Sequence, residues 1–411
     1  MFRSAAVAAA VACTSGSSAQ SSPPQPPGAR AAADSARLQE IVGWYRFADL
    51  GPAIVTWGAQ QELTLMVVRD TMLWAPMVAA GTDSFAVPQP ADRPPSAVRI
   101  MRDANHRVTG LRWTGYRGVH DAVRDSDGEY SAHPVEYNAA GGEPIGATLF
   151  LPRGEGPHPG AVVIHGSGTS TRDNSWYMTL VDALAASGIA VLFPDKRGSG
   201  SSGGDWRTAD LSVLGRDVLA GVEWLRRHTA LDTSAIGLLG ISQGGHIAPW
   251  VANESPGIAW VVNVSGSAVP LNEQLRHEVT QDLRRSAWPR FLHPLVRSVS
   301  LRVIRGRQPE WWERNGHLDP IADWRALQVP GLTLYGADDE RDNVPVRRSV
   351  ERLTALGKPN LTTRVFEGSG HALYSAGTMR IRRDVLELLR DWIHKAVARD
   401  TASGGSQAPA L

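Results

Sequence analysis

From about residue 135 onward, the chain alternates short, nearly continuous apolar runs with longer stretches in which apolar residues recur at helical spacing. Continuous apolar runs are expected for strands covered on both faces, and strands that alternate with helices indicate a parallel sheet. We expect strands at residues 161–164, 189–193, 236–241, 260–264, 332–335 and 363–366. We expect helices at residues 176–187, 209–228, 346–356 and 379–397. The pattern predicts an α/β domain over residues 135–398, with its ligand site at the carboxyl ends of the strands.

Between residues 37 and 130 the apolar runs are shorter and turn residues are more frequent. Strand-like runs occupy residues 62–68, 72–77, 98–101 and 108–113. The last two flank Asp103-Ala104-Asn105-His106, a turn-forming tetrapeptide that predicts a hairpin loop. We therefore expect a small antiparallel β domain over residues 37–130. It contains no catalytic constellation, so its expected role is to pack against the larger domain.

The first residues have the order of a secretory signal, since Arg3 precedes an apolar run and small residues lead to a cleavage position after Ala19. The run is too short to span a bilayer. Residues 20–36 are rich in proline and serine and predict an extended linker. Cys13 follows Ala10-Val11-Ala12, which resembles a bacterial lipoprotein signal, so Cys13 is a candidate lipid anchor. We expect an exported protein, periplasmic or secreted, with a disordered tail at residues 399–411.

Composition narrows the chemistry. The 42 basic and 41 acidic side chains give a net charge of +1, and no run of five or more like charges occurs, which argues against a nucleic-acid partner and a polybasic membrane patch. The single cysteine excludes an intrachain disulfide and a thiolate metal site. Residues 198–203 match G-x-G-x-x-G, but residues 204–208 intervene before helical periodicity begins, so we interpret them as a loop. No cofactor and no metal are implied, and a small-molecule substrate is expected.

The strongest motif is Gly240-Ile241-Ser242-Gln243-Gly244, a G-x-S-x-G pattern placed after a predicted strand and before a predicted helix. In that context the glycines allow a sharp turn that raises the serine hydroxyl above the sheet edge. A serine nucleophile needs a base, which can lie far away in sequence. Among the histidines, His371 is best placed, because it follows the last predicted strand and precedes the last long helix; His165 and His246 have structural explanations.

The third catalytic group should be a carboxylate that orients the histidine. The loop after residues 332–335 offers Asp338, Asp339 and Asp342, all between the serine and the histidine in the chain. Spacing alone leaves these three open.

Taken together, these motifs resemble the α/β-hydrolase superfamily, and more narrowly bacterial serine esterases and the serine-aminopeptidase-like hydrolases near them. The resemblance covers about Pro144 to Ala396. It rests on the serine motif and on residues 151–157, 165–168, 195–202, 336–345 and 370–371. The N-terminal region loosely resembles the small lipocalin-like β domains that accompany some bacterial serine hydrolases, through residues 42–45 and 102–111.

The resemblance implies an α/β-hydrolase fold and assigns roles. It places the acid at Asp339, although two extra residues before Val344-Pro345 depart from the family pattern and keep Asp342 an alternative. It assigns the oxyanion hole to the backbone N–H groups of Ser167 and Gln243.

Residues 266–327 exceed what the core sheet needs and predict a helical cap over the serine. Trp311 and Trp312 in this insertion either line an apolar substrate pocket or only pack the cap. We expect a serine hydrolase that cleaves carboxylic esters through an acyl-enzyme, acting on a small ester or a short peptide-like substrate. A thioesterase or an aminopeptidase-like enzyme is the alternative, the latter with an amine anchor at Glu254, Glu273 or Glu310; a noncatalytic binding protein on the same fold is a further one. The sequence leaves the oligomeric state open.

Overall fold

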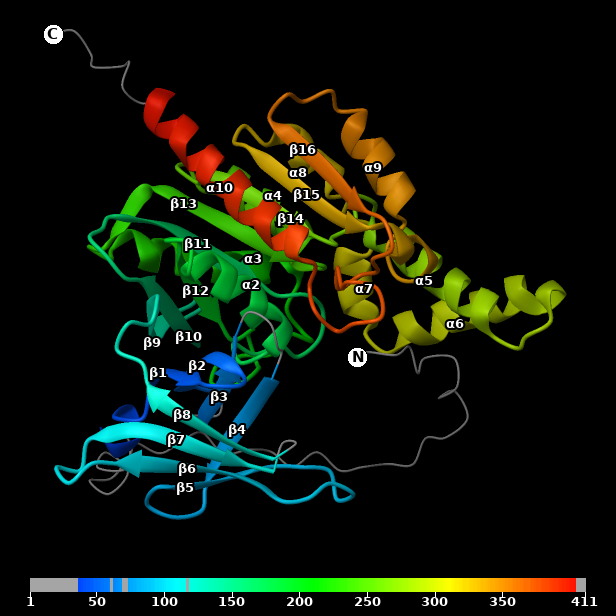
Figure 1. Ribbon diagram of the computed structural model, residues 1–411. Helices are drawn as coiled ribbons and strands as arrows, with labels where there is room; N and C mark the ends of the chain where they lie inside the picture. The colour runs from blue at the N-terminus through cyan, green and yellow to red at the C-terminus, as the bar shows by residue number, and fades with distance from the viewer. Residues whose placement is uncertain (1–35, 60–61, 69–72, 116–117, 404–411) are drawn as a thin grey trace, which may run out of the picture.

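The computed structural model describes residues 36–59, 62–68, 73–115 and 118–403, which form an N-terminal barrel and a larger α/β domain (Figure 1). The predicted export signal and the candidate anchor Cys13 lie in residues 1–35, outside the described part. No helix in the described part is long and apolar enough to cross a membrane.

The N-terminal unit is a closed antiparallel barrel of eight strands, each paired with the next in the chain, with the first also paired to the last. Its strands are β1 (Gly43–Phe47), β2 (Gly51–Trp57), β3 (Leu63–Val67), β4 (Leu73–Ala79), β5 (Ser84–Val87), β6 (Ser96–Arg102), β7 (Val108–Thr114) and β8 (Val119–Arg124). The predicted hairpin is β6 and β7, with His106 in the turn at a φ of +62°. The four predicted runs correspond to β3, β4, β6 and β7. The other four strands were missed because they are short or begin at turn residues, as β2 does at Gly51-Pro52.

Strands β1, β2 and β3 of the barrel pack against the larger domain. Along β6 buried and exposed residues alternate, as in a sheet with one wet face, whereas all five residues of β3 are buried. Leu65 points into the apolar barrel core, while its neighbour Met66 belongs to the core of the larger domain. Trp44 of β1 hydrogen-bonds to the larger domain, because its indole N–H donates to Tyr130 O at 2.6 Å. The barrel interior is filled by apolar side chains and serves as a packed support.

The larger domain is built on an eight-stranded mixed sheet in the order β16-β15-β14-β13-β11-β12-β10-β9. The strands are β9 (Tyr130–Asn138), β10 (Pro144–Pro152), β11 (His158–Ile164), β12 (Ala190–Pro194), β13 (Leu231–Ile241), β14 (Trp260–Val264), β15 (Gly331–Gly336) and β16 (Leu361–Phe366). The six strands from β16 to β12 are parallel, and β10 and β9 extend the sheet antiparallel. Because β9 begins at Tyr130, the sheet includes Tyr130, which was predicted to belong to the β domain, and residues 131–134, which the predicted limits left between the two domains.

Helices cover both faces of this sheet (Figure 1). They are α2 (Ser175–Ala185), α3 (Leu211–Arg226), α4 (Gly244–Glu254), α5 (Leu271–Arg285), α6 (His293–Gly306), α7 (Pro309–Asn315), α8 (Ile321–Ala326), α9 (Val346–Thr354) and α10 (Arg383–Ser403), with 3-10 turns η2 (Arg290–Leu292) and η3 (Ala337–Arg341). Helices α2 and α10 pack in one apolar core, and α3, α4, α8 and α9 in the other. Helices α5 to α8 form the insertion between β14 and β15.

The last helix differs from the prediction at both ends. It begins at Arg383 rather than Met379, because Ile381 forms an isolated β-bridge with Tyr374. It continues to Ser403, so residues 399–403, which were expected to be part of a disordered tail, are helical, and the rest of the predicted tail, residues 404–411, lies outside the described part.

Candidate active site

The G-x-S-x-G motif forms the turn between β13 and α4. Ser242 has a φ of +52°, a conformation that L-residues rarely adopt, and its N–H donates to Val264 O at 2.8 Å. Close backbone approach demands the flanking glycines: a Cβ on Gly240 would lie 2.3 Å from Gly244 O, and one on Gly244 would lie 2.2 Å from Ile164 O. The turn places the Ser242 hydroxyl at the carboxyl edge of the sheet and the start of α4, where developing negative charge is favoured.

His371 and Asp339 lie in line with this serine. His371 Nε2 is 3.1 Å from Ser242 Oγ, and His371 Nδ1 is 2.7 Å from Asp339 Oδ2. A carboxylate can only accept, so Nδ1 carries the proton and Nε2 is free to accept the one on Ser242. The histidine loop is held by two hydrogen bonds, from Ser265 Oγ to His371 O at 2.7 Å and from Trp176 Nε1 to Ala372 O at 3.0 Å.

The short helical turn η3 decides which carboxylate meets the histidine. Its rotation buries Asp339 completely and leaves Asp338 exposed. The second oxygen of Asp339 accepts from the Asn343 N–H at 3.2 Å. Asp342 instead points outward, with its side chain 57 % exposed, and pairs with Arg285 at 2.9 Å. Of the three candidates, only Asp339 contacts His371.

Neighbouring carboxylates set the charge preference of the histidine. Burial by itself would lower the pKa of His371, but Asp339, with smaller contributions from Asp342 and Glu278, raises that pKa above its usual value. Glu278 comes from α5, and burial in turn raises the pKa of its carboxyl. The imidazolium that would form when His371 takes a proton from Ser242 is therefore stabilised.

The segment around Gly166 lies against the serine, since a Cβ on Gly166 would be 3.3 Å from Ser242 Cβ. The Gly166 N–H is committed to the Tyr177 hydroxyl at 2.8 Å. Among the hydrogen bonds between described residues, neither the Ser167 nor the Gln243 amide donates. The Ser167 and Gln243 amides thus have no hydrogen-bond acceptor among the described residues.

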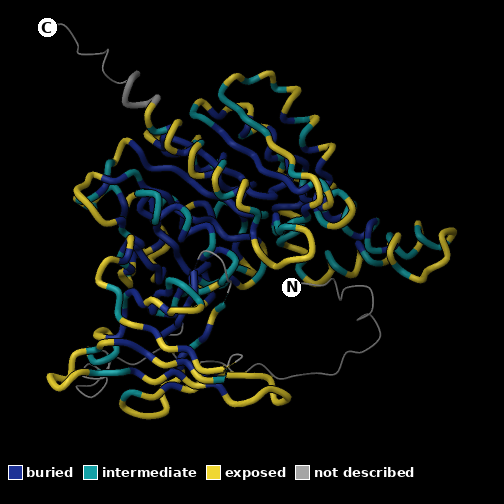
Figure 2. The backbone as a smooth tube through the Cα atoms, viewed as in Figure 1, coloured by how far each residue is buried: buried dark blue, intermediate teal, exposed yellow. Residues whose placement is uncertain are grey.

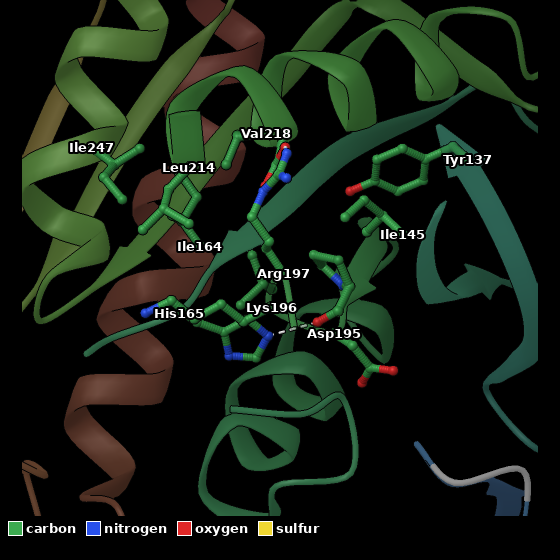
Figure 3. A pocket seen from close by; sticks show the side chains of 13 residues that line it. Tyr137, Ile145, Ile164, His165, Asp195, Lys196, Arg197, Leu214, Val218 and Ile247 are labelled. Carbon is green, nitrogen blue, oxygen red and sulfur yellow. Dashed lines mark hydrogen bonds and ion pairs between the residues drawn. The ribbon is translucent and has the colours of Figure 1, made fainter. Parts of the chain in front are cut away.

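A buried lysine ties these two segments together. Lys196 Nζ donates to Gly166 O at 2.7 Å and to Gln243 Oε1 at 2.9 Å. Figure 3 shows Lys196 beside His165, at the wall of a cavity of about 40 Å³ between the sheet and α3. Desolvation lowers the pKa of Lys196 to about 7. Lys196 thus binds the Gly166 carbonyl, which shares a peptide unit with the Ser167 amide. It also binds the side chain of Gln243, whose backbone carries the second amide.

The amino-acid sequence is similar to those of known hydrolases. The model of the alpha/beta hydrolase family matches residues 161–377, which is more than half of the chain. The chain belongs to the alpha/beta hydrolase family. It is 26 % identical to the peroxisomal succinyl-coenzyme A thioesterase of Mus musculus over 238 residues, covering 55 % of this chain and 52 % of the relative. It is 24 % identical to the esterase EstD of Thermotoga maritima, covering 55 % and 57 %.

The chain thus spans about half the length of these two relatives. A Pyrococcus furiosus esterase of known structure matches with a TM-score of 0.47 and 20 % identity, covering 66 % of this chain and 91 % of that one. Membership of the family confirms the predicted fold and supports hydrolase activity.

The other histidines considered in this hydrolase have structural partners. Both nitrogens of His165 are bonded, Nε2 to Pro194 O at 2.6 Å and Nδ1 to Ser170 Oγ at 2.7 Å, and burial lowers the pKa of His165 to about 4. His246 Nε2 lies 3.1 Å from Ser267 Oγ, and burial also lowers the pKa of His246 to about 4. Within the described residues, no group of three His, Cys, Asp or Glu side chains could hold a metal.

The three candidate amine anchors lie at the surface of the protein. Glu273 lies 4.0 Å from Arg348 and Glu310 lies 3.1 Å from Arg314, both as surface ion pairs, and Glu254 is exposed at the end of α4. The acidic side chain that the inserted helices do bring to the site is Glu278, which sequence reasoning missed.

The two cap tryptophans act in packing. Trp311 Nε1 donates to Ala209 O at 3.0 Å, and Trp312 lies edge-on to it with ring centroids 5.0 Å apart. Both pack against the core formed by α3 and α4. The structure thus favours the packing interpretation over a substrate-lining role.

The sequence also predicted no role for Lys196, although residues 195–202 contribute to the resemblance to the α/β-hydrolases. A lysine directly after a buried strand, at the carboxyl edge that carries the site, was the available signal.

Proposed function

We propose that this hydrolase is a serine esterase that cleaves carboxylic esters through an acyl-enzyme at Ser242. The observation that carries the proposal is the 3.1 Å approach of Ser242 Oγ to His371 Nε2, with the opposite nitrogen of the same ring bonded to the fully buried Asp339. A noncatalytic binding protein would have no need of this aligned set.

The geometry supports a two-step reaction. His371 accepts the proton of Ser242 as its oxygen attacks the ester carbonyl, and the Ser167 and Gln243 amides stabilise the resulting oxyanion. His371 then returns the proton to the departing alcohol, which leaves an acyl group on Ser242. Water, activated by the same histidine, releases the acid.

In this scheme Lys196 is a positioning residue. By binding Gly166 O it fixes the peptide plane that carries the Ser167 N–H, and by binding Gln243 Oε1 it joins that segment to the residue carrying the second donor. Preorganised donors are effective because they need not move as charge develops.

Stoichiometric labelling by a fluorophosphonate tests the proposal. The wild-type protein should take up one equivalent, and Ser242→Ala should take up none. Ser234→Ala, an exposed serine on the same strand, is the matched control and should label fully. A well-folded wild-type protein that does not label, or a Ser242→Ala variant that still does, would overturn the assignment.

A thioester is the second candidate substrate, because the same groups cleave it and the relatives include the succinyl-coenzyme A thioesterase named above. Release of thiol from short acyl-coenzyme A should be compared with release of alcohol from the matching acyl ester. A kcat/KM that is about tenfold or more higher for the thioester would replace esterase by thioesterase while leaving the Ser242 mechanism intact.

A further inference from the structure

One part of the protein is apolar on its outside. The hairpin of α5 and α6 projects from the body of the α/β domain (Figure 1), and Figure 2 shows its outer surface largely exposed or half-buried. Exposed apolar side chains gather on η2, α6 and the turn before them. They are Trp288 (46 % exposed), Phe291 (81 %), Leu295 (63 %), Val299 (50 %) and Val303 (43 %).

Helix α6 carries two sets of apolar side chains. Val296, Leu301 and Ile304 pack against α5 in a small core of their own. Leu295, Val299 and Val303 recur every four residues and form a separate stripe that faces outward. The inner face accounts for the folding of the hairpin and leaves the outer stripe without a partner among the described residues.

The segment that carries this stripe is rich in arginine. Residues 283–309 contain no acidic side chain and seven arginines, namely Arg284, Arg285, Arg290, Arg297, Arg302, Arg305 and Arg307. Of the seven, Arg285 alone forms ion pairs between described residues, with Asp282 and Asp342. Because other residues separate most of these arginines, they form no run of five or more like charges.

We propose that this surface, residues 284–307, docks the protein on a bilayer that carries anionic lipids. An amphipathic helix with aromatic and aliphatic side chains on one face and arginines beside it lies in the membrane interface, with the apolar face among the acyl chains and the cations at the headgroups. Both kinds of side chain are present in residues 284–307, with Arg302 next to the stripe on α6.

The charge distinguishes this partner from a second copy of the chain. A symmetric dimer through the stripe would bring two copies of the segment together, each with six arginines that form no ion pair between described residues. Anionic headgroups neutralise the same charges. The proposal goes beyond the ester chemistry and can be tested without a substrate.

Helix α5, which leads into residues 284–307, contacts the loop beside His371. On α5, Gln274 Nε2 donates to Asn343 Oδ1 at 3.3 Å, and Asn343 Nδ2 is 3.4 Å from His371 Nε2. At the far end of α5, Arg285 pairs with Asp342 in the loop of the catalytic acid. Docking through residues 284–307 would therefore hold the rim of the site near the lipid surface.

The test is co-sedimentation of the full chain with vesicles of phosphatidylcholine alone or with an equal amount of phosphatidylglycerol. We expect binding to the anionic vesicles that weakens as salt is raised. Arg290→Glu/Arg297→Glu/Arg302→Glu should reduce partitioning by at least about a hundredfold, since the loss of each arginine near the surface costs about fivefold and the new carboxylates repel the anionic headgroups. Phe291→Ser/Leu295→Ser/Val299→Ser should reduce it at least about tenfold.

Val119→Ser/Val123→Ser on β8 removes two side chains of similar exposure, 58 % and 63 %, and should bind as wild type. Phe291→Ser alone keeps the test decisive should the apolar triple variant fail to fold, as judged by circular dichroism. Three results would overturn the proposal: no binding to anionic vesicles, binding that the hairpin variants do not alter, or a dimer in solution that the apolar variant dissolves. A fourth result would also overturn the proposal: the chain binds duplex DNA and not vesicles, and the arginine variant alone abolishes that binding.

Discussion

Replacement of Lys196 by methionine removes the ammonium that binds both Gly166 O and Gln243 Oε1, and it keeps the length of the side chain. Gly166 O is buried and would lose its charged donor, which lies at 2.7 Å. Gln243 Oε1, at 2.9 Å, belongs to a partly exposed residue and can be hydrated instead. The Gly166 carbonyl therefore dominates the effect.

Below a pH of about 7, where Lys196 is charged, a hydrogen bond from it contributes about 1.5–3 kcal/mol, which corresponds to a factor of about 10 to 150 in rate if the whole of it serves the transition state. Complete loss of one oxyanion donor would cost about 10² to 10³. We therefore expect kcat to fall about 10- to 100-fold with KM changed less than about threefold.

Stability should move the other way. The folded lysine releases its proton at a pKa of about 7 and the unfolded one at 10.5, so the unfolded state binds more protons between these values and wild-type stability rises with pH there. Below this window the buried charge destabilises the fold by on the order of 5 kcal/mol. That exceeds the roughly 1–3 kcal/mol expected for the orphaned carbonyl. Lys196→Met should thus unfold at an equal or higher temperature at pH 7 and lack the rise toward pH 10.

Steady-state hydrolysis of a short p-nitrophenyl ester and thermal unfolding measured on the same samples test the reasoning. Arg207→Met is the matched control, because Arg207 also stacks on Trp206, at 4.7 Å compared with 5.3 Å for Lys196, and is exposed. A kcat for Lys196→Met within threefold of wild type would refute the positioning role. A fall in activity that merely follows a lower melting temperature would show Lys196 to be structural only.

Asp339→Asn should lower kcat about 10³- to 10⁴-fold by losing the correct histidine tautomer, and Asp342→Asn should stay within about threefold; the reverse ranking in the same ester assay would reassign the acid. Glu278→Gln should move the acid limb of kcat/KM to lower pH, because the Glu278 carboxylate helps to raise the pKa of His371 and the neutral imidazole is the base; a superimposable pH profile would contradict this coupling. Gly244→Ala should destabilise the fold by about 1–3 kcal/mol, measured by urea unfolding, because its Cβ would meet Ile164 O, whereas Gly306→Ala in open space should be neutral or slightly stabilising; equal effects would argue against the tight elbow.

Features set by neighbouring residues were readable from the chain alone. The continuous apolar runs predicted the buried parallel strands, and the glycines around Ser242 predicted the turn, because both depend on local backbone geometry and local burial. The β6–β7 hairpin was predicted for the same reason. Strands without such a local signature, such as β1 and β8, were missed, since their pairing joins residues about eighty positions apart in closing the barrel.

The choice among Asp338, Asp339 and Asp342 depended on the rotation of one short helical turn against a loop thirty residues later, which spacing does not encode. The role of Lys196 depended on β12 and β11 lying side by side, so that a side chain after one strand reaches the loop after the other. Likewise, the sequence of residues 283–309 showed seven arginines without an acid, but only the packing of α6 on α5 showed which apolar face is used and which is left outside. The sequence by itself thus determined the turn that carries Ser242, the order of the proposed catalytic groups along the chain and the strands that carry them. The tertiary structure decided which partners meet, because contacts between distant segments are set by sheet order and helix rotation rather than by any local pattern.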